Sequence, residues 1–278
     1  MTRRFDSKVV LITGASAGIG AAAARRFADE GARVVLAARR EGPLDEMAAE
    51  LRGRGAEALV VPTDVADTAS CAALIERAVE ELGGLDVLVN NAGAHFRGAF
   101  ESRSPEEIAT MVDVNVRGPL VLTRLALPHL RRSGGAVVHV ASLAGMVPLP
   151  DAATYSSTKA ALRIFSLALA EELRGSAVTS TLVSPGPIID TGFLMGSLEE
   201  AADVTLSQPV STADEVATRI LECALDGERE RAMPPASAAL AKAAYLFPGL
   251  RRVLEPVMKE RGKRKKAELQ ARRDRGEI

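Results

Sequence analysis

Short runs of β-branched and aliphatic residues alternate along this chain with longer, alanine-rich stretches. Each run is apolar throughout, whereas a strand with one face in water alternates apolar and polar residues. Such runs are typical of a parallel sheet that is covered by helices on both faces. The runs that predict strands are 9–13, 33–38, 58–61, 87–90, 136–141 and 178–183. Because parallel strands are joined by right-handed helical crossovers, we expect a doubly wound α/β fold in a single domain.

The pattern changes near residue 225, where the chain divides into two expected parts. Residues 1–230 are expected to form the sheet domain, and residues 231–278 a helical extension. The extension predicts two helices, at 236–246 and 250–258. We expect the apolar segment 243–250 to cover an edge of its own sheet or a neighbouring subunit.

The chain ends in a basic tail. Residues 259–278 hold nine Lys or Arg against four Asp or Glu. We expect a solvated, partly frayed terminal helix here. Weak contact with an anionic membrane surface is the alternative interpretation.

The composition excludes several classes of function. Lys and Arg number 35 against 36 Asp and Glu, and the formal net charge of −1 gives no general attraction for nucleic acid. Aromatic residues are 3% of the chain, too few for a base-stacking surface. Cys71 and Cys223 form no paired motif, so we expect two buried thiols in a reducing compartment. No metal site is predicted, because metal-ligand spacing is lacking among His95, His129 and His139.

The chain begins with a short polar segment, 1–7, which leads directly into the first apolar run. Neither a signal peptide nor a transit peptide fits such a start. No apolar stretch approaches the length that is needed to cross a bilayer. We therefore expect a cytoplasmic protein.

A glycine-rich turn follows the first predicted strand and opens into a helix at 21–30. Residues 13–20 read Thr-Gly-Ala-Ser-Ala-Gly-Ile-Gly, with the spacing Gly-x-x-x-Gly-x-Gly. Glycines let the backbone approach a pyrophosphate closely, and the amides at the helix start meet its charge. The turn predicts a dinucleotide-binding loop in which the cofactor contacts are Gly14, Ser16, Gly18, Ile19 and Gly20.

Tyr155 and Lys159 stand four residues apart in a predicted helix at 152–172, so both side chains project from one face. Ser142 lies shortly upstream, at the end of a predicted strand. A neighbouring ammonium favours the phenolate form of tyrosine, which would make the phenol an acid and base near neutral pH. The trio predicts a site that holds a carbonyl oxygen and moves a proton. An ordinary amphipathic helix with a surface lysine is the alternative.

Six motifs together resemble the short-chain dehydrogenase/reductase family, in the family's order and spacing over most of residues 8–230. They are the glycine turn, the Asn-Asn-Ala-Gly sequence at 90–93, Asn115, Ser142, the pair Tyr155 and Lys159, and the Pro-Gly at 185–186. The resemblance implies a Rossmann fold and an oxidoreductase that interconverts carbonyls and alcohols with a nicotinamide cofactor.

By this resemblance the catalytic residues are Asn115, Ser142, Tyr155 and Lys159. Ser142 would hold the substrate oxygen, and Tyr155 would donate or remove the proton. Lys159 would bind the nicotinamide ribose and favour the tyrosinate, while Asn115 would distort its helix to fix a water that links Lys159 to solvent. These roles suit hydride transfer, because charge develops on the oxygen when hydride reaches the carbon.

The resemblance also assigns cofactor contacts beyond the glycine turn. Asn91, Ala92 and Gly93 would pass beneath the adenosine. Asp64 would accept a hydrogen bond from the adenine amine, with Val65 beside the ring. A solvated turn aspartate is the alternative for Asp64.

The nicotinamide end of the cofactor is assigned to Pro185, Gly186 and Ile188 in the same way. The family's threonine commonly lies four residues after the glycine. Here Thr191 lies five residues after Gly186. Whether Thr191 contacts the cofactor therefore stays open.

The end of the second predicted strand bears on the choice of nicotinamide. An acidic residue there would bind the ribose 2′-hydroxyl and repel a 2′-phosphate. This chain has Ala-Ala-Arg-Arg at 37–40. Arg39, together with Ser16, would bind the phosphate through charge-assisted hydrogen bonds. A solvated pair of arginines after the strand is the alternative. We expect NADP(H) in preference to NAD(H). Dependence on NADPH would suggest carbonyl reduction as the physiological direction of a reversible reaction.

Substrate-facing loops are expected at 94–100, 143–154 and 187–209, after three of the strands. Their apolar side chains either line a pocket for a lipophilic carbonyl or alcohol or pack the loops against the core: Leu143, Met146, Val147, Leu149, Phe193, Leu194 and Met195. We expect surface positions for His95 and Arg97, and contact with a polar group of the substrate is the alternative.

Two further expectations come from the resemblance. Relatives assemble as dimers or tetramers through helices that match 105–130 and 152–175, so a homo-oligomer is expected. The rival to an enzyme is a non-catalytic dinucleotide-binding protein with a regulatory or scaffold role. Such a protein has no physical need for a proton-transfer set, and the presence of the set favours the enzyme.

Overall fold

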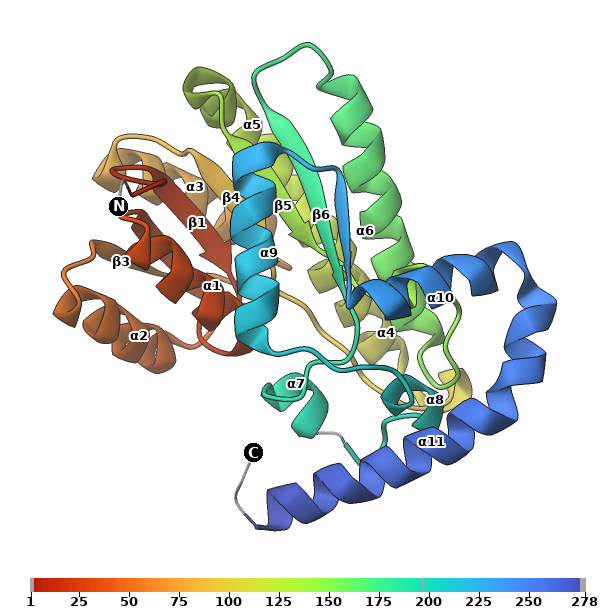
Figure 1. Ribbon diagram of the computed structural model, residues 1–278. Helices are drawn as coiled ribbons and strands as arrows, with labels where there is room; N and C mark the ends of the chain where they lie inside the picture. The colour runs from red at the N-terminus through yellow and green to blue at the C-terminus, as the bar shows by residue number, and fades with distance from the viewer. Residues whose placement is uncertain (1–2, 197, 276–278) are drawn as a thin grey trace.

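The computed structural model describes residues 3–196 and 198–275. Within these ranges the chain forms a seven-stranded parallel sheet of order β3-β2-β1-β4-β5-β6-β7 (Figure 1). The chain starts at the centre, winds outward to β3, returns to β4 and winds outward in the other direction, which is the Rossmann arrangement. The strands are β1 Val9–Thr13, β2 Arg33–Ala38, β3 Ala58–Pro62, β4 Val87–Asn90, β5 Ala136–Val140, β6 Thr179–Pro185 and β7 Glu230–Met233.

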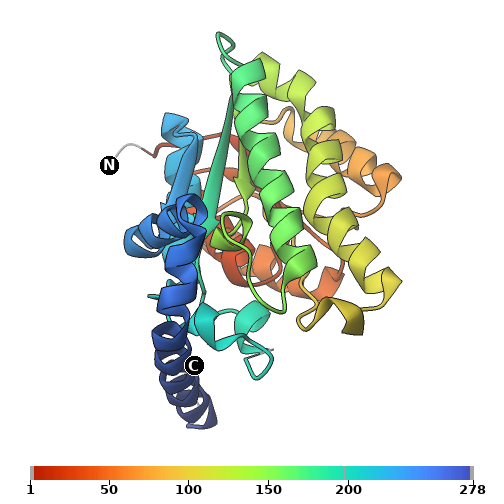
Figure 2. The ribbon, with the colours of Figure 1, turned by 90° about the vertical axis from the view of Figure 1, so that its right-hand side faces the viewer.

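Helices cover both faces of the sheet (Figure 2). Alternate side chains of a strand point to opposite faces, so Val10 and Ile12 of β1 join one core while Val9 and Leu11 join the other. The first core is completed by α1 Gly18–Asp29, α2 Glu41–Gly53 and α9 Ala213–Asp226. The second is completed by α3 Thr68–Leu82, α5 Gly118–Ser133 and α6 Ala153–Glu172. The predicted doubly wound fold is confirmed.

Helix starts follow local chemistry that is visible in the sequence. Ser104 caps α4, Pro105–Val112, by accepting a hydrogen bond from the Glu107 amide at 3.2 Å, and the Glu107 carboxylate accepts one from the Ser104 amide at 3.1 Å. In contrast, Ala17 precedes α1 without any side-chain cap. The amides of the first turn of α1 are therefore left for another partner.

β7 was not predicted from the sequence. It pairs with β6 at the sheet edge, and its sequence is Glu-Arg-Ala-Met. The Glu230 carboxylate accepts hydrogen bonds from the Arg163 guanidinium at 2.8 and 2.7 Å and from the Ser184 hydroxyl at 3.2 Å. An edge strand that places a charged side chain in an ion pair carries no apolar run, so the sequence pattern misses it. β7 also runs across the expected division between residues 230 and 231.

The C-terminal extension consists of α10 Pro235–Leu246 and α11 Pro248–Asp274. The predicted helices at 236–246 and 250–258 fall within α10 and α11, and the predicted terminal helix is a continuation of α11. It differs from the prediction in that α11 packs across α8, Asp203–Leu206 (Figure 1). Leu269 is fully buried in this contact. A Cβ atom at Gly262 would lie 1.8 Å from the Asp203 carbonyl oxygen, so the two backbones touch.

The elbow between α10 and α11 does not take the first of its two predicted roles, and contact with a neighbouring subunit stays a prediction. Tyr245, Leu246 and Phe247 are exposed, at 71%, 69% and 65%, so these side chains do not cover the edge of their own sheet. The helices of the described residues include none that is both long and apolar enough to span a membrane.

Candidate active site

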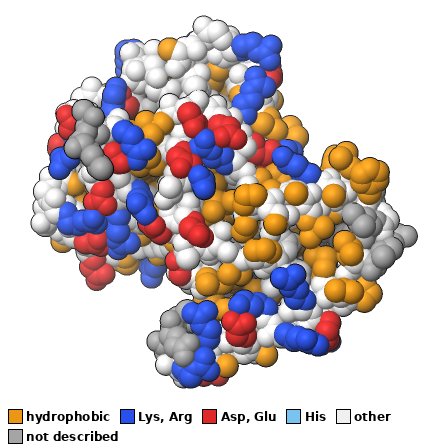
Figure 3. All heavy atoms as spheres, viewed as in Figure 1, with side chains coloured by type: hydrophobic (Ala, Val, Ile, Leu, Met, Phe, Trp, Pro, Cys, Tyr) orange, Lys and Arg blue, Asp and Glu red, His pale blue; other side chains and the backbone are white. Residues whose placement is uncertain are grey.

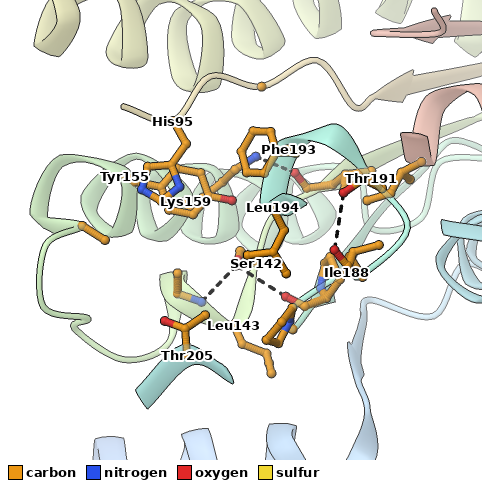
Figure 4. A pocket seen from close by; sticks show the side chains of 18 of the residues that line it. His95, Ser142, Leu143, Tyr155, Lys159, Ile188, Thr191, Phe193, Leu194 and Thr205 are labelled. Carbon is orange, nitrogen blue, oxygen red and sulfur yellow. Dashed lines mark hydrogen bonds between the residues drawn. The ribbon is translucent and has the colours of Figure 1, made fainter. Parts of the chain in front are cut away.

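A cavity of about 480 Å³ opens at the carboxyl ends of the central strands (Figure 4). Parallel strands end at the same edge of the sheet, so loops that are far apart in sequence meet there. Most of the sequence-predicted site residues line this cavity: Gly14, Gly18, Ile19, Asn91, Ala92, Gly93, Ser142, Tyr155, Lys159, Pro185, Gly186 and Ile188. The volume is typical of a small-molecule site.

The glycine turn is held against the end of β4. Gly14 and Gly18 have φ of +67° and +54°, a region that other residues rarely adopt. A Cβ at Gly20 would lie 2.2 Å from the Gly14 carbonyl oxygen. Asn91 donates from its side-chain amide to the Thr13 carbonyl at 2.8 Å, and its backbone amide donates to the Thr13 hydroxyl at 3.0 Å. The turn is thus rigid and brings unpaired helix amides to the cavity.

Asn115 lies in a π-helical turn, Asp113–Arg117, between α4 and α5. Its side chain is fully buried and exchanges two hydrogen bonds of 2.8 Å with the backbone of Ala94. Its amide also donates to the Thr158 hydroxyl at 3.1 Å. The helix distortion that was expected around Asn115 is present. The Asn115 side chain ties the loop after β4 to α6.

Lys159 and Ser142 have fixed positions beside Tyr155. The Lys159 ammonium donates to the Val140 carbonyl at 2.9 Å and lies 5.8 Å from the centroid of the Tyr155 ring. The Ser142 hydroxyl accepts from the Ala144 amide at 3.1 Å and donates to the Pro185 carbonyl at 3.4 Å (Figure 4). The side chains come from α6 and the end of β5, which confirms that the fold brings them together.

The protonation of this trio differs from the expectation in one respect. Burial lowers the pKa of the Lys159 ammonium to about 8. Burial raises the pKa of the Tyr155 phenol, and the hydrogen bond with Ser142 and the charge of Arg97 only partly oppose it. The pKa of the phenol is thus raised, whereas a lowered pKa was expected, and Tyr155 is a neutral phenol at pH 7.

His95 was missed as a site residue. Its ring stacks on the Tyr155 ring with centroids 4.0 Å apart and planes at 11°, and Arg97 from the same loop also lines the cavity (Figure 4). The expected surface positions of both residues are wrong. Burial lowers the pKa of His95 to about 3, so the imidazole is neutral. Within the described part of the chain, both of its ring nitrogens are buried without a hydrogen-bond partner.

Other predicted cofactor residues lie outside the cavity lining: Ser16, Gly20, Arg39, Asp64 and Val65. Arg39 is exposed at the end of β2, while Arg40 does line the cavity. The Asp64 carboxylate accepts from the Ala66 amide at 2.9 Å, which is the turn that the alternative interpretation expected. Thr191 lines the cavity beside Gly18.

The apolar loop residues divide between the two roles that the sequence left open. Five of them line the cavity: Leu143, Val147, Leu149, Phe193 and Leu194. Met146 packs instead in a cluster with Ala238 and Ala241 of α10. Met195 packs against the cluster that contains Leu269 of α11.

The C-terminal helix shapes the site through the segment between β6 and α9, which includes α7, Gly192–Met195, and α8. The Lys266 ammonium donates to the carbonyls of Glu199 and Ala201, at 2.5 and 3.1 Å. The neighbouring side chains of this segment face the cavity: Glu200, Ala202 and Thr205. Sequence reasoning missed the contact. Gly262 and the isolated apolar Leu269 were its only local signs.

The chain has two cysteines. Cys71 and Cys223 are fully buried as predicted, and burial raises their thiol pKa values to about 11 and about 12.

Across residues 3–196 and 198–275, no three His, Cys, Asp or Glu side chains gather as a metal site would require.

Comparison with known proteins agrees with this geometry. Residues 8–202 match the sequence model of the short chain dehydrogenase family. A ketoacyl reductase of Nostoc sp. is 36% identical over 218 residues, which cover 78% of this chain and 76% of the relative. A 2,5-dichloro-2,5-cyclohexadiene-1,4-diol dehydrogenase of Sphingobium indicum is 42% identical over 187 residues, which cover 67% of this chain and 75% of the relative.

Solved structures give the same result. A short-chain dehydrogenase/reductase of Burkholderia phymatum in complex with NAD superposes with a TM-score of 0.80 at 29% identity, covering 90% of this chain and 97% of that one. One from Burkholderia cenocepacia in complex with NADP has a TM-score of 0.76 at 31% identity, with 82% and 97% covered. The chain belongs to the short-chain dehydrogenase/reductase family. It is an oxidoreductase of the class that acts on alcohols and carbonyl compounds.

Proposed function

We propose that the protein is an NADP(H)-dependent oxidoreductase that interconverts a ketone or aldehyde and an alcohol on a hydrophobic small molecule. The observation that carries the proposal is one cavity that holds both the glycine turn and the trio Ser142, Tyr155 and Lys159. Steady-state oxidation of NADPH with a panel of hydrophobic carbonyl compounds tests it. Tight NADPH binding without turnover of any compound would favour the non-catalytic binder instead.

The site's residues fit a nicotinamide dinucleotide. The uncapped amides at the start of α1 suit a pyrophosphate, and Gly14 and Gly18 leave the backbone open to close approach. Pro185, Gly186 and Ile188 line the cavity next to the catalytic trio, where the nicotinamide end belongs. When bound, the cofactor supplies or accepts a hydride at the substrate carbon.

The chain's own residues then handle the oxygen and the proton. Ser142 donates a hydrogen bond to the substrate oxygen, and Tyr155 transfers a proton to it during reduction. Because burial keeps Tyr155 neutral near pH 7, the phenol is present as the acid that reduction needs. Lys159 holds the ribose, and Asn115 keeps the loop at Ala94 in place.

The proposal includes a preference for NADP(H) over NAD(H). The end of β2 carries Arg39 and Arg40 and no acidic residue. We expect Arg39→Ala to lower the ratio of kcat/KM for NADPH over NADH about tenfold, since one charge-assisted hydrogen bond at an exposed position contributes little more. Arg131→Ala removes the same charge at the exposed end of α5 and should leave the ratio unchanged. A wild-type protein that prefers NADH would contradict the assignment.

The affinity for NADPH should depend on pH through Lys159. Its ammonium, with a pKa of about 8, is charged below that pH and loses its proton as the pH rises through it. We expect a dissociation constant that is level near pH 7 and rises by up to about tenfold per pH unit above 8. Fluorescence titration of NADPH measures this. Lys159→Arg stays charged over the whole range and should abolish the rise; an unchanged rise in that variant would contradict the role.

Assembly as a homo-oligomer also belongs to the proposal. Val112 on α4 and Ile164 on α6 are 44% and 61% exposed, on the helices through which relatives are expected to associate. We expect light scattering to give a dimer or tetramer, and Ile164→Glu to shift it toward monomer because the charge would be buried at the interface. A wild-type monomer would rule the assembly out. A cytoplasmic location stays a prediction.

A further inference from the structure

A second chamber adjoins the active-site cavity on the side of the C-terminal extension. Its volume is about 40 Å³, which is room for about three water-sized groups. It is lined by Val147, Pro148, Leu149, Val204, Gln208, Leu240, Ala241, Ala244, Leu254, Glu255 and Met258. Most of these side chains are apolar, so the chamber suits a hydrocarbon group.

The chamber and the cavity share a wall. Val147, Leu149 and Gln208 line both spaces. The side-chain oxygen of Gln208 is buried, and within the described residues it has no hydrogen-bond partner. A glutamine that is not anchored through its oxygen can turn aside without breaking a bond there. Gln208 is therefore the side chain of this wall that a substrate chain can displace.

The outer wall of the chamber belongs to the extension. Ala244 lies on α10, and Leu254 and Met258 lie on α11, which is held in place by its contact with α8. Next to these residues in the sequence, Tyr245 and Val257 are 71% and 70% exposed. Figure 3 shows hydrophobic side chains gathered over this part of the surface. Apolar side chains thus lie on both sides of the chamber, toward the cavity and toward the exposed surface.

We propose that the chamber is a subsite for the aliphatic tail of the substrate, so that preferred substrates carry their carbonyl or hydroxyl group on an unbranched alkyl chain. This inference rests on the proposed carbonyl–alcohol chemistry of the same cavity. Short substrates react in the cavity alone, whereas a longer chain enters the chamber. Each methylene that leaves water for the chamber should raise kcat/KM about fourfold, until about three are accommodated.

A series of 2-alkanones from butanone to 2-dodecanone, reduced with NADPH, tests the subsite. Wild-type kcat/KM should rise with chain length. Ala244→Leu fills the chamber and should remove most of the rise while butanone reduction stays the same. Ala243→Leu is the matched control, because that neighbour on α10 is equally half-buried but does not line the chamber. It should behave as the wild type does.

A second variant keeps the test independent of how well Ala244→Leu folds. Met258→Ala enlarges the chamber and should extend the rise to longer ketones. Butanone turnover with no dependence on chain length, or the same dependence in all variants, would overturn the subsite and leave the proposed function standing. If the wild type turns over no ketone of the series but reduces other carbonyl compounds of the panel, the subsite falls and the proposed function stands. If it turns over no compound of the panel, both fall.

Discussion

Replacing Tyr155 by phenylalanine is expected to lower kcat/KM for carbonyl reduction by about 10²- to 10⁴-fold, the usual contribution of a positioned general acid. In the proposed mechanism the phenol is the acid that gives a proton to the substrate oxygen, and burial keeps it protonated near neutral pH. Phenylalanine retains the ring that stacks on His95, so the cavity keeps its shape. Initial rates of NADPH oxidation with the best ketone of a panel measure the loss.

The control for this prediction uses the other tyrosine of the chain. Tyr245 is 71% exposed at the elbow of α10 and α11, and Tyr245→Phe should leave kcat/KM as it is. The dissociation constant for NADPH should change by less than about threefold in Tyr155→Phe. The proposed role of the phenol is to act on the substrate oxygen and not to bind the cofactor. Near wild-type turnover in Tyr155→Phe would show that another group supplies the proton.

Replacing Gly262 by leucine is expected to lower kcat/KM by about 100-fold. Any side chain at this position would overlap the Asp203 carbonyl, since even a Cβ would lie 1.8 Å from that oxygen. α11 must then separate from α8, and the burial of Leu269 and the hydrogen bonds of Lys266 are lost. The burial of Leu269 and a hydrogen bond of the Lys266 ammonium each stabilise the contact between α11 and α8 by about 1.5–3 kcal/mol. The segment that carries Glu200 and Thr205 would no longer be held against the cavity.

Gly249→Leu is the matched control for Gly262→Leu. Gly249 lies in the same helix, and a Cβ there meets nothing within 4 Å. Limited proteolysis should cleave α11 faster in Gly262→Leu than in wild type or control, and KM for the ketone should rise more than kcat falls. If Gly262→Leu matches the control in both measurements, the extension does not support the active site.

The parts of the fold that sequence reasoning found are those that local rules govern. The six apolar runs became strands because a strand covered on both faces must be apolar along its whole length. The glycine turn was recognisable because only glycine fits the φ of +67° at Gly14 and the 2.2 Å approach at Gly20. Tyr155 and Lys159 were paired through helix periodicity alone.

The parts that were missed depend on distant partners. β7 owes its place to the ion pair of Glu230 with Arg163, 67 residues earlier in the chain. His95 stacks on Tyr155 from the loop after β4, which Asn115 ties to α6 across 43 residues of sequence. The pKa of the Tyr155 phenol was misjudged because a sequence does not show burial. Here burial raises this pKa more than Ser142 and the charge of Arg97 lower it.

The amino-acid sequence alone determined the doubly wound sheet, the glycine turn and the pairing of Tyr155 with Lys159, because strand burial, turn geometry and helix periodicity each act over a few neighbouring residues. Tertiary structure alone decided that α11 crosses the segment between β6 and α9. It also decided that an apolar chamber lies against α10 and α11. The physical reason is that these features come from contacts such as Gly262 against Asp203, in which neither partner carries a local signal of the other.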